Sequence, residues 1–212
     1  KSEVVLLSEA LSMLNDIEIA NLRGYRFIKQ GGVMIEDGDK VVAGLTTQDI
    51  IRNEYTIEFW KFCFDGSSDT PVKNMGSVSP GVPCILHEIG HAMMYSRSRP
   101  YMEAMYFKNK YQKEYDKASA AKQKEMKPRL DELKVIHDKA EAEYNKNPSV
   151  ESEFLKLVKG KPPLTPYSKK NDREAFAEAF AIYKVDPGLL KKKNLKLFEY
   201  FERSGFDVKT SK

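Results

Sequence analysis

The segment "CILHEIGHAMMYSRSRP" (84–100) places two of the chain's three histidines in one apolar stretch. Pro83 suits the first position of a helix, because its missing N–H would be unpaired there anyway, and Pro100 predicts that this helix ends before it. In a helix, His87 and His91 lie four residues apart on the same face. Two unpaired imidazoles are costly to bury, so the chain needs a fold that gives both of them a partner.

Two imidazole nitrogens at this spacing can hold one zinc ion. Glu88 lies about 100° around the helix from His87, where it can accept a proton from an activated water molecule without binding the metal itself. The pattern His-Glu-x-x-His is that of zinc peptidases. The alternative is a pair of core histidines that are satisfied by hydrogen bonds. Gly90, a glycine inside the helix, indicates close packing against another element.

A catalytic zinc site needs a third protein ligand and one open position. The long metzincin pattern is excluded, because Met94 and Arg97 stand where its glycine and third histidine would be. His137 lies among charged residues, and we expect it to be a solvated surface histidine. A better source of the third ligand is the segment "NDREAFAEAFAIY" (171–183), which is typical of a helix.

Glu174 and Glu178 share one face of this second helix, which otherwise carries small and aromatic side chains. Glu174 follows Asn171 by three residues, so it could bind the metal or complete an N-terminal capping box. Glu178 could bind the metal, or it could hydrogen-bond a ligating histidine. Spacing alone leaves both possibilities open.

The motif "LHEIGHAM", followed much later by "YSKKNDREAFAEAF" (167–180), resembles the catalytic domain of anthrax lethal factor and the related Pro-Pro endopeptidases, the lethal-factor-like zinc metallopeptidases. Members of that family carry a tyrosine seven residues before a ligating glutamate, and Tyr167 has this spacing from Glu174. The resemblance implies that Glu174 is the third ligand, that Glu178 supports a ligating histidine, and that Tyr167 donates a hydrogen bond to the developing oxyanion. It covers residues 83–98 and 164–184.

The resemblance further implies a zincin-like α+β fold and a zinc-dependent endopeptidase with one Zn²⁺, ligated by His87, His91 and Glu174, and with Glu88 as general base. The substrate would be a protein or peptide. Family members include toxins that cut signalling kinases and secreted enzymes that cut between prolines, so the resemblance favours a secreted or delivered effector. The first residues of the chain do not form a signal peptide, because acidic residues interrupt the apolar run.

Composition excludes several other classes. No apolar run approaches the roughly 20 residues that span a bilayer. The net charge of +4 comes from 35 basic and 31 acidic residues that are mostly intermixed, and this distribution does not favour nucleic-acid binding. The two cysteines make no disulfide framework, and Cys84 is expected to be a small buried residue.

The length of 212 residues is consistent with a single domain. We expect an α/β part with a small mixed sheet (1–82), the active-site helix (83–98), a charged helical insertion (101–147) and a C-terminal helical part with the third ligand (148–212). Residues 54–64 are the strongest predicted strand. They are either a candidate edge for binding an extended peptide or a buried central strand. A loop follows from residue 66, and Pro128 is predicted to divide the insertion into an antiparallel hairpin.

Two other functions fit parts of this pattern. One is a binding module in which zinc is structural and the basic helical hairpin engages a partner. Glu88 argues against it, because a structural site needs no general base and closes all four positions with protein ligands. The other is a metallohydrolase that acts on something other than peptides.

Overall fold

The computed structural model describes residues 1–32, 34–36, 40–65, 78–96, 98–146 and 150–203. The predicted loop at 66–77 therefore lies outside the described residues. The strands are β1 (Arg26–Lys29), β2 (Met34–Glu36), β3 (Lys40–Val42), β4 (Gly44–Asp49) and β5 (Glu54–Phe59). The helices are α1 (Glu3–Ser12), α2 (Asp16–Asn21), α3 (Lys61–Phe64), α4 (Val82–Met94), α5 (Arg99–Lys117), α6 (Ala120–Lys146), α7 (Val150–Val158), α8 (Asp172–Val185), α9 (Pro187–Lys193) and α10 (Leu195–Arg203), with a 3-10 turn η1 (Tyr167–Lys169).

A three-stranded mixed sheet has the order β1-β5-β4, in which β5 runs parallel to β1 and antiparallel to β4. Strands β2 and β3 form a separate antiparallel pair. The mixed α+β class with a small N-terminal sheet is thus confirmed. Of the two alternatives for 54–64, the buried central strand is confirmed, because β5 is central and buries Tyr55, Ile57 and Phe59.

The predicted strand at 54–64 is too long. After Phe59 the chain forms the short helix α3, whose N-cap Trp60 is still extended and accepts a hydrogen bond from the Cys63 backbone N–H at 3.0 Å. Aromatic residues favour strands because they fit a pleated, half-buried surface. Here Cys63 reaches complete burial in the core from a helix, so packing overrides this local preference.

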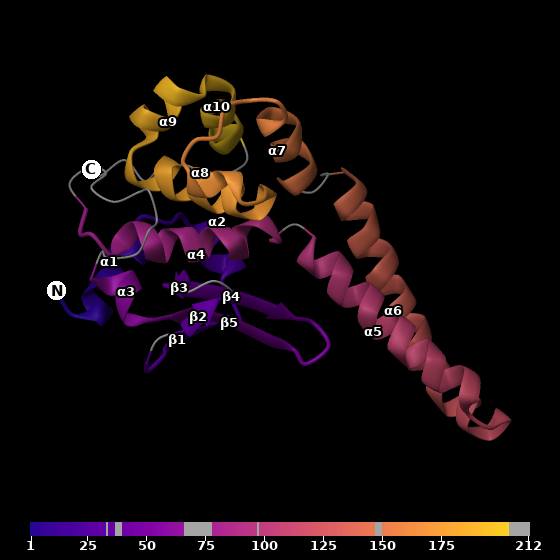
Figure 1. Cartoon of the computed structure of the whole chain (residues 1–212). Coiled ribbons are helices and arrows are strands. Elements are labelled where there is room, and N and C mark those ends of the chain that lie inside the picture. Colours follow the sequence, from indigo (N-terminus) through magenta and orange to yellow (C-terminus); the bar gives the residue numbers. More distant parts are fainter. Residues whose placement is uncertain (33, 37–39, 66–77, 97, 147–149, 204–212) are drawn as a thin grey trace.

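Helix α4 lies between the sheet and α8, with α9 and α10 on the far side of α8 (Figure 1). Nearly every residue of α4 is buried. At Gly90 a Cβ atom would stand 2.9 Å from the Ala177 Cα atom and 3.3 Å from the Phe180 Cβ atom. Gly90 therefore allows α4 and α8 to approach closely, as the sequence predicts.

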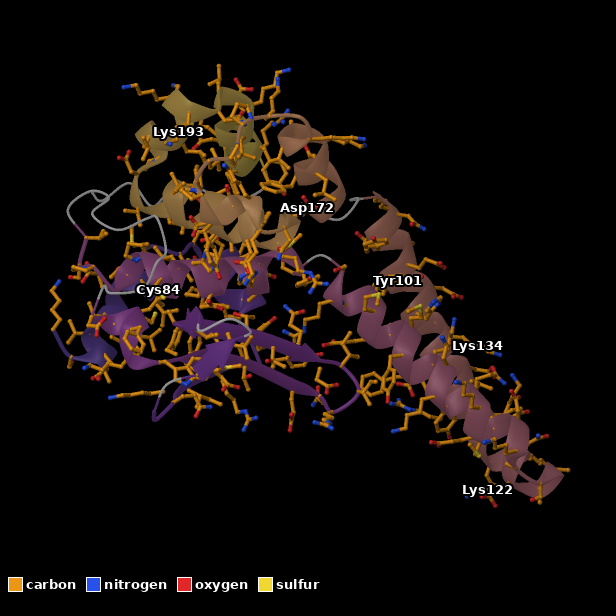
Figure 2. All side chains as sticks on the ribbon, in the orientation of Figure 1. Cys84, Tyr101, Lys122, Lys134, Asp172 and Lys193 are labelled. Atoms are coloured by element: carbon orange, nitrogen blue, oxygen red, sulfur yellow. The ribbon has the colours of Figure 1, made fainter. Side chains whose placement is uncertain are left out.

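Helices α5 and α6 pair as an arm that projects from the body (Figure 1), with Tyr101 near its base and Lys122 toward its tip (Figure 2). The predicted division at Pro128 is wrong. The chain reverses at Ala118, which is extended, while Pro128 lies inside α6. Proline inside a helix costs about 3 kcal/mol, yet α6 continues past Pro128 and buries Leu130 and Leu133 in the turns that follow.

The base of the arm is fixed to the sheet by Arg99. Its guanidinium carbon lies 3.8 Å from the centre of the Tyr55 ring on β5, and its Nε donates to Glu103 at 2.8 Å. The Tyr55 hydroxyl donates to the same carboxylate. A cation held over an aromatic face and paired with a carboxylate joins the start of α5 to the body.

His137 is not the solvated histidine that its charged neighbours predict. Its side chain is 9% exposed and lies in the arm, with its ring 5.7 Å from that of Tyr101. Cys84 is buried, as expected for a small apolar residue, and Cys63 is buried as well; both thiols are free. No helix in the described part of the chain has the length and apolar character needed to cross a membrane.

Candidate metal centre

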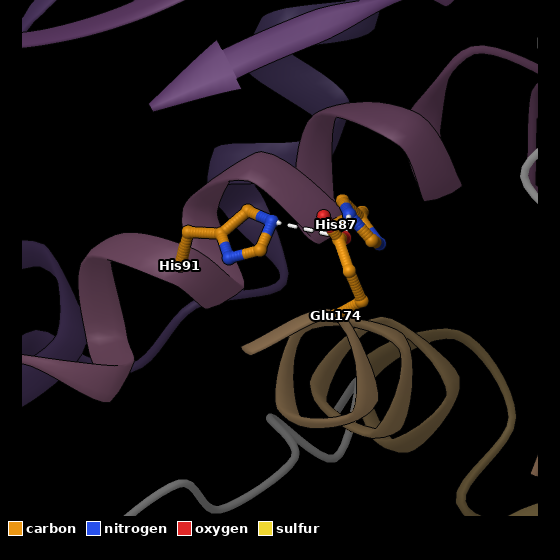
Figure 3. A group of neighbouring side chains, drawn as sticks. All are labelled: His87, His91 and Glu174. Atoms are coloured by element: carbon orange, nitrogen blue, oxygen red, sulfur yellow. Dashed lines mark hydrogen bonds and ion pairs between the residues drawn. The ribbon is translucent and has the colours of Figure 1, made fainter. Parts of the chain in front are cut away.

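Helix α4 presents His87 and His91 to α8, one helical turn apart (Figure 3). The centres of their rings are 4.9 Å apart. His87 is 2% exposed, whereas His91 retains partial exposure. His87 is therefore buried and His91 lies nearer the surface, so a ligand can approach the pair from the side of His91.

Glu174 reaches the same point from the first turn of α8 (Figure 3). Its Oε2 atom lies 3.0 Å from the Nε2 atom of His87 and 3.3 Å from that of His91. One ligand atom from each of the three residues falls within a 4.8 Å group. Tetrahedral zinc with bonds of about 2.0–2.1 Å places its ligand atoms about 3.3 Å apart, so the three side chains fit such an ion.

The backbone at the start of α8 frees the Glu174 side chain for this role. The Asn171 side chain accepts a hydrogen bond from the Glu174 N–H at 3.0 Å and caps the helix. The Glu174 carboxylate turns to the histidines instead. Glu174 therefore lies in the first turn of α8, capped by Asn171, while its carboxylate contacts His87 and His91.

Glu178 lies one turn further along α8 and is fully buried. Its Oε1 atom is 2.9 Å from the Nδ1 atom of His87, the ring nitrogen opposite the cluster. A carboxylate in this place fixes the ring orientation and directs the other nitrogen toward the metal position. Glu178 therefore orients His87 and lies outside the three-residue group.

The electrostatics of the cluster favour a cation. Burial works against protonation of His87, but its hydrogen bonds to Glu174 and Glu178 raise its pKa well above the ordinary value. Burial alone would raise the pKa of Glu174, yet its hydrogen bonds from His87 and His91 lower that pKa strongly. The lowered pKa of Glu174 keeps its carboxylate negative next to the imidazoles, and a proton or a metal ion can compensate this charge.

Glu88 lies beside the cluster without joining it. Its side chain is 5% exposed and extends toward β4, where the Thr46 Oγ1 atom is 3.0 Å from its Oε2 atom and 2.8 Å from its backbone oxygen. Gly44 of β4 lies directly against the same side chain. The sequence assigns no role to Gly44 or Thr46, although the segment "AGLT" (43–46) also resembles the opening segment of the lethal-factor-like family, because a short strand does not reveal which helix it faces.

Tyr167 lies in η1, just before α8, with its ring centre 5.7 Å from that of His87. Thr165 and Ser168 hold this turn, since each backbone N–H donates to the hydroxyl of the other residue, at 3.1 and 3.0 Å. Burial, followed by the negative charge of Glu174, raises the pKa of Tyr167 to about 12. Its hydroxyl therefore keeps its proton at neutral pH and can act as a donor.

A second group of possible ligands, His137, Asp138 and Glu141, lies within one turn of α6. The Asp138 side chain is 75% exposed and accepts from the adjacent His137 at 3.1 Å. This group draws on a single helix. The α4–α8 cluster instead combines two elements and a buried orienting carboxylate, which makes it the stronger candidate for a metal centre.

Comparisons of the chain with models of known families, with curated proteins and with solved structures found no match.

Proposed function

We propose that this protein is a zinc-dependent endopeptidase of the lethal-factor-like type. The observation that carries the proposal is the convergence of His87, His91 and Glu174, with the unligated carboxylate of Glu88 beside them. A structural zinc site would close its fourth position with a protein ligand and would need no general base. The position of Tyr167 against His87 adds a donor suited to an oxyanion.

The residues have distinct roles in the proposed hydrolysis. When bound, zinc would polarise the scissile carbonyl and lower the pKa of water to about 7. Glu88 accepts the proton of the attacking water and transfers it to the leaving amine. Tyr167 donates a hydrogen bond to the oxygen that gains negative charge, and Glu178 keeps His87 in its orientation.

The sheet offers a place for an extended peptide. In the described part of the chain, β4 pairs with β5 along one edge and has no strand partner along the other. Thr46 of β4 contacts Glu88, so a peptide on this edge would pass close to the general base. Backbone hydrogen bonds to an edge strand bind a peptide without selecting its side chains. We therefore propose an extended segment of a protein as the substrate.

Replacing Glu88 by alanine tests this function. The variant should fold and bind zinc as the wild type does, because Glu88 is not a ligand, while its kcat for peptide hydrolysis should fall by about 100- to 10,000-fold. Cleavage of a mixed peptide library, with and without a metal chelator, measures the activity, and metal analysis measures the zinc content.

A matched control is Glu125→Ala, which removes an exposed carboxylate at the distal end of the arm and should leave cleavage unchanged. Full activity in the Glu88 variant, or cleavage by the wild type that a chelator does not reduce, would contradict the proposal.

A further inference from the structure

We propose that Gly44 and Thr46 of β4 form a seat that positions the Glu88 carboxylate, and that they are positioning residues for catalysis. This inference rests on the function proposed above. It assigns a catalytic purpose to a strand that supplies neither a metal ligand nor the general base.

The first part of the seat is the space at Gly44. A Cβ atom built there would stand 2.4 Å from the Glu88 Cγ atom, 2.6 Å from Cδ and 2.6 Å from Oε1. Real carbon atoms do not approach so closely. Any other L-residue at position 44 would therefore occupy the volume that the general base fills, and the flexible Glu88 side chain would have to move away.

The second part is the hydroxyl of Thr46. It has one proton and two acceptors within reach, the Glu88 backbone oxygen at 2.8 Å and the carboxylate Oε2 at 3.0 Å. It can donate to Glu88 as a carboxylate. Once Glu88 carries a proton, the hydroxyl can donate to the backbone oxygen and accept from the acid. Thr46 can thus hold Glu88 in place before and after the proton transfer.

The seat also explains how α4 can carry both the histidine ligands and the general base. His87 and His91 face α8, whereas Glu88, about 100° further around the helix, extends toward the sheet. The Glu88 side chain has several rotatable bonds. A misplacement of its carboxylate by about 1 Å can lower the rate about 100-fold. Contacts with Gly44 and Thr46 restrict these bonds. Because β4 is also the edge strand of the sheet in the described residues, it would hold the general base in a fixed register with a peptide bound along it.

The hydroxyl is tested by three variants of the full chain. Thr46→Val should lower kcat by about 10- to 100-fold, the effect of losing one hydrogen bond to a charged group, with little change in KM or in zinc content. Thr46→Ser keeps the hydroxyl and should restore most of kcat. The control Thr56→Val removes a hydroxyl that donates to the Glu58 Oε1 atom at 3.1 Å on the central strand β5, away from the site, and should match the wild-type kcat.

The space is tested by Gly44→Ala, with Gly31→Ala as its control, since a Cβ at Gly31 meets nothing within 4 Å. The Gly44 variant should lose about 100-fold or more in kcat while it retains zinc, because the clash is with a movable side chain. Gly31→Ala should have unchanged kcat. Unchanged kcat in both Gly44→Ala and Thr46→Val would overturn the proposal.

A thermal measurement on metal-free protein tests the contact independently of activity. Thr46→Val should lower Tm more in the wild-type background than in the Glu88→Ala background, where its carboxylate partner is already absent. Equal losses of Tm would show that Thr46 does not bond the carboxylate and would overturn the seat. Failure of the proposed peptidase function would give a different result: the wild-type protein would show no cleavage that a chelator reduces.

Discussion

His87 is the residue of the site whose two ring nitrogens both have a carboxylate partner. Its Nε2 atom faces Glu174 and its Nδ1 atom faces Glu178, so both ring nitrogens lie next to carboxylates. In the metal-free protein these carboxylates raise the pKa of His87 and so favour the doubly protonated imidazolium. A zinc ion must displace one of these protons to use Nε2 as a ligand.

The raised pKa of His87 predicts a defined pH dependence. In the metal-free protein, the imidazolium stabilises the fold fully below its ordinary pKa of about 6.5, and this contribution is lost as the pH rises through the higher pKa of the folded state. Zinc binding has the opposite dependence and should weaken as the pH falls. At pH 7, zinc binding should release about one proton from His87.

Titration calorimetry in buffers with different ionisation enthalpies measures this proton release. The wild type should show a binding enthalpy that depends on the buffer. In Glu178→Gln, which removes one of the two carboxylates next to His87, the dependence should be smaller. A wild-type binding enthalpy that is identical in all buffers would contradict the assignment of His87.

Spacing along the chain predicts part of this site and no more. Helical periodicity is sufficient to place His87 and His91 on one face and Glu88 off it. It cannot separate Glu174 from Glu178, because both lie on the same face of α8, and the difference depends on where α8 meets α4. Thr46 could not be found either, since its role depends on a contact between a strand and a helix far apart in sequence.

At the scale of elements, a buried ion pair joins α8 to α2, and the sequence of α8 alone does not predict it. Lys184 lies 2.7 Å from Glu18, and both side chains are fully buried. Glu18 also completes the capping box of α2 with Asn15. From the sequence Glu18 is an ordinary capping residue, and Lys184 is an ordinary cation in the last turn of a helix. Tertiary packing alone brings them together.

Removing one partner of this pair should be costly. Lys184→Met leaves the Glu18 carboxylate buried without its cation, and it should lower the free energy of unfolding by about 3–5 kcal/mol. The control Lys146→Met breaks an exposed pair with Glu143 and should cost less than about 1 kcal/mol. Urea denaturation of both variants measures the difference, and equal losses would contradict the buried pair.

The errors in predicted elements have a common cause. Pro128 and the aromatic run after Phe59 are strong local signals, yet the structure continues a helix through the first and ends a strand before the second. In both places burial of other residues exceeds the local preference. Where packing and propensity agree, as at Asn171 before α8, the predicted boundary is confirmed.

At the scale of the whole molecule, the site lies where two long-range contacts meet. Helix α4 packs against β4 on one side and α8 on the other, and these elements are distant in sequence (Figure 1). The mixed α+β class follows from the order of strand and helix signals along the chain. The convergence of α4 with α8 does not, because no local pattern encodes which helices meet.

The most direct test of the account is a crystal structure of the zinc-bound protein with anomalous diffraction at the zinc edge. We predict one strong peak at about 2.0–2.2 Å from the Nε2 atoms of His87 and His91 and from a Glu174 carboxylate oxygen, with Glu88 outside bonding distance. A peak at His137, Asp138 and Glu141 instead, or a fourth protein ligand that closes the α4–α8 site, would contradict the assignment of a catalytic metal centre.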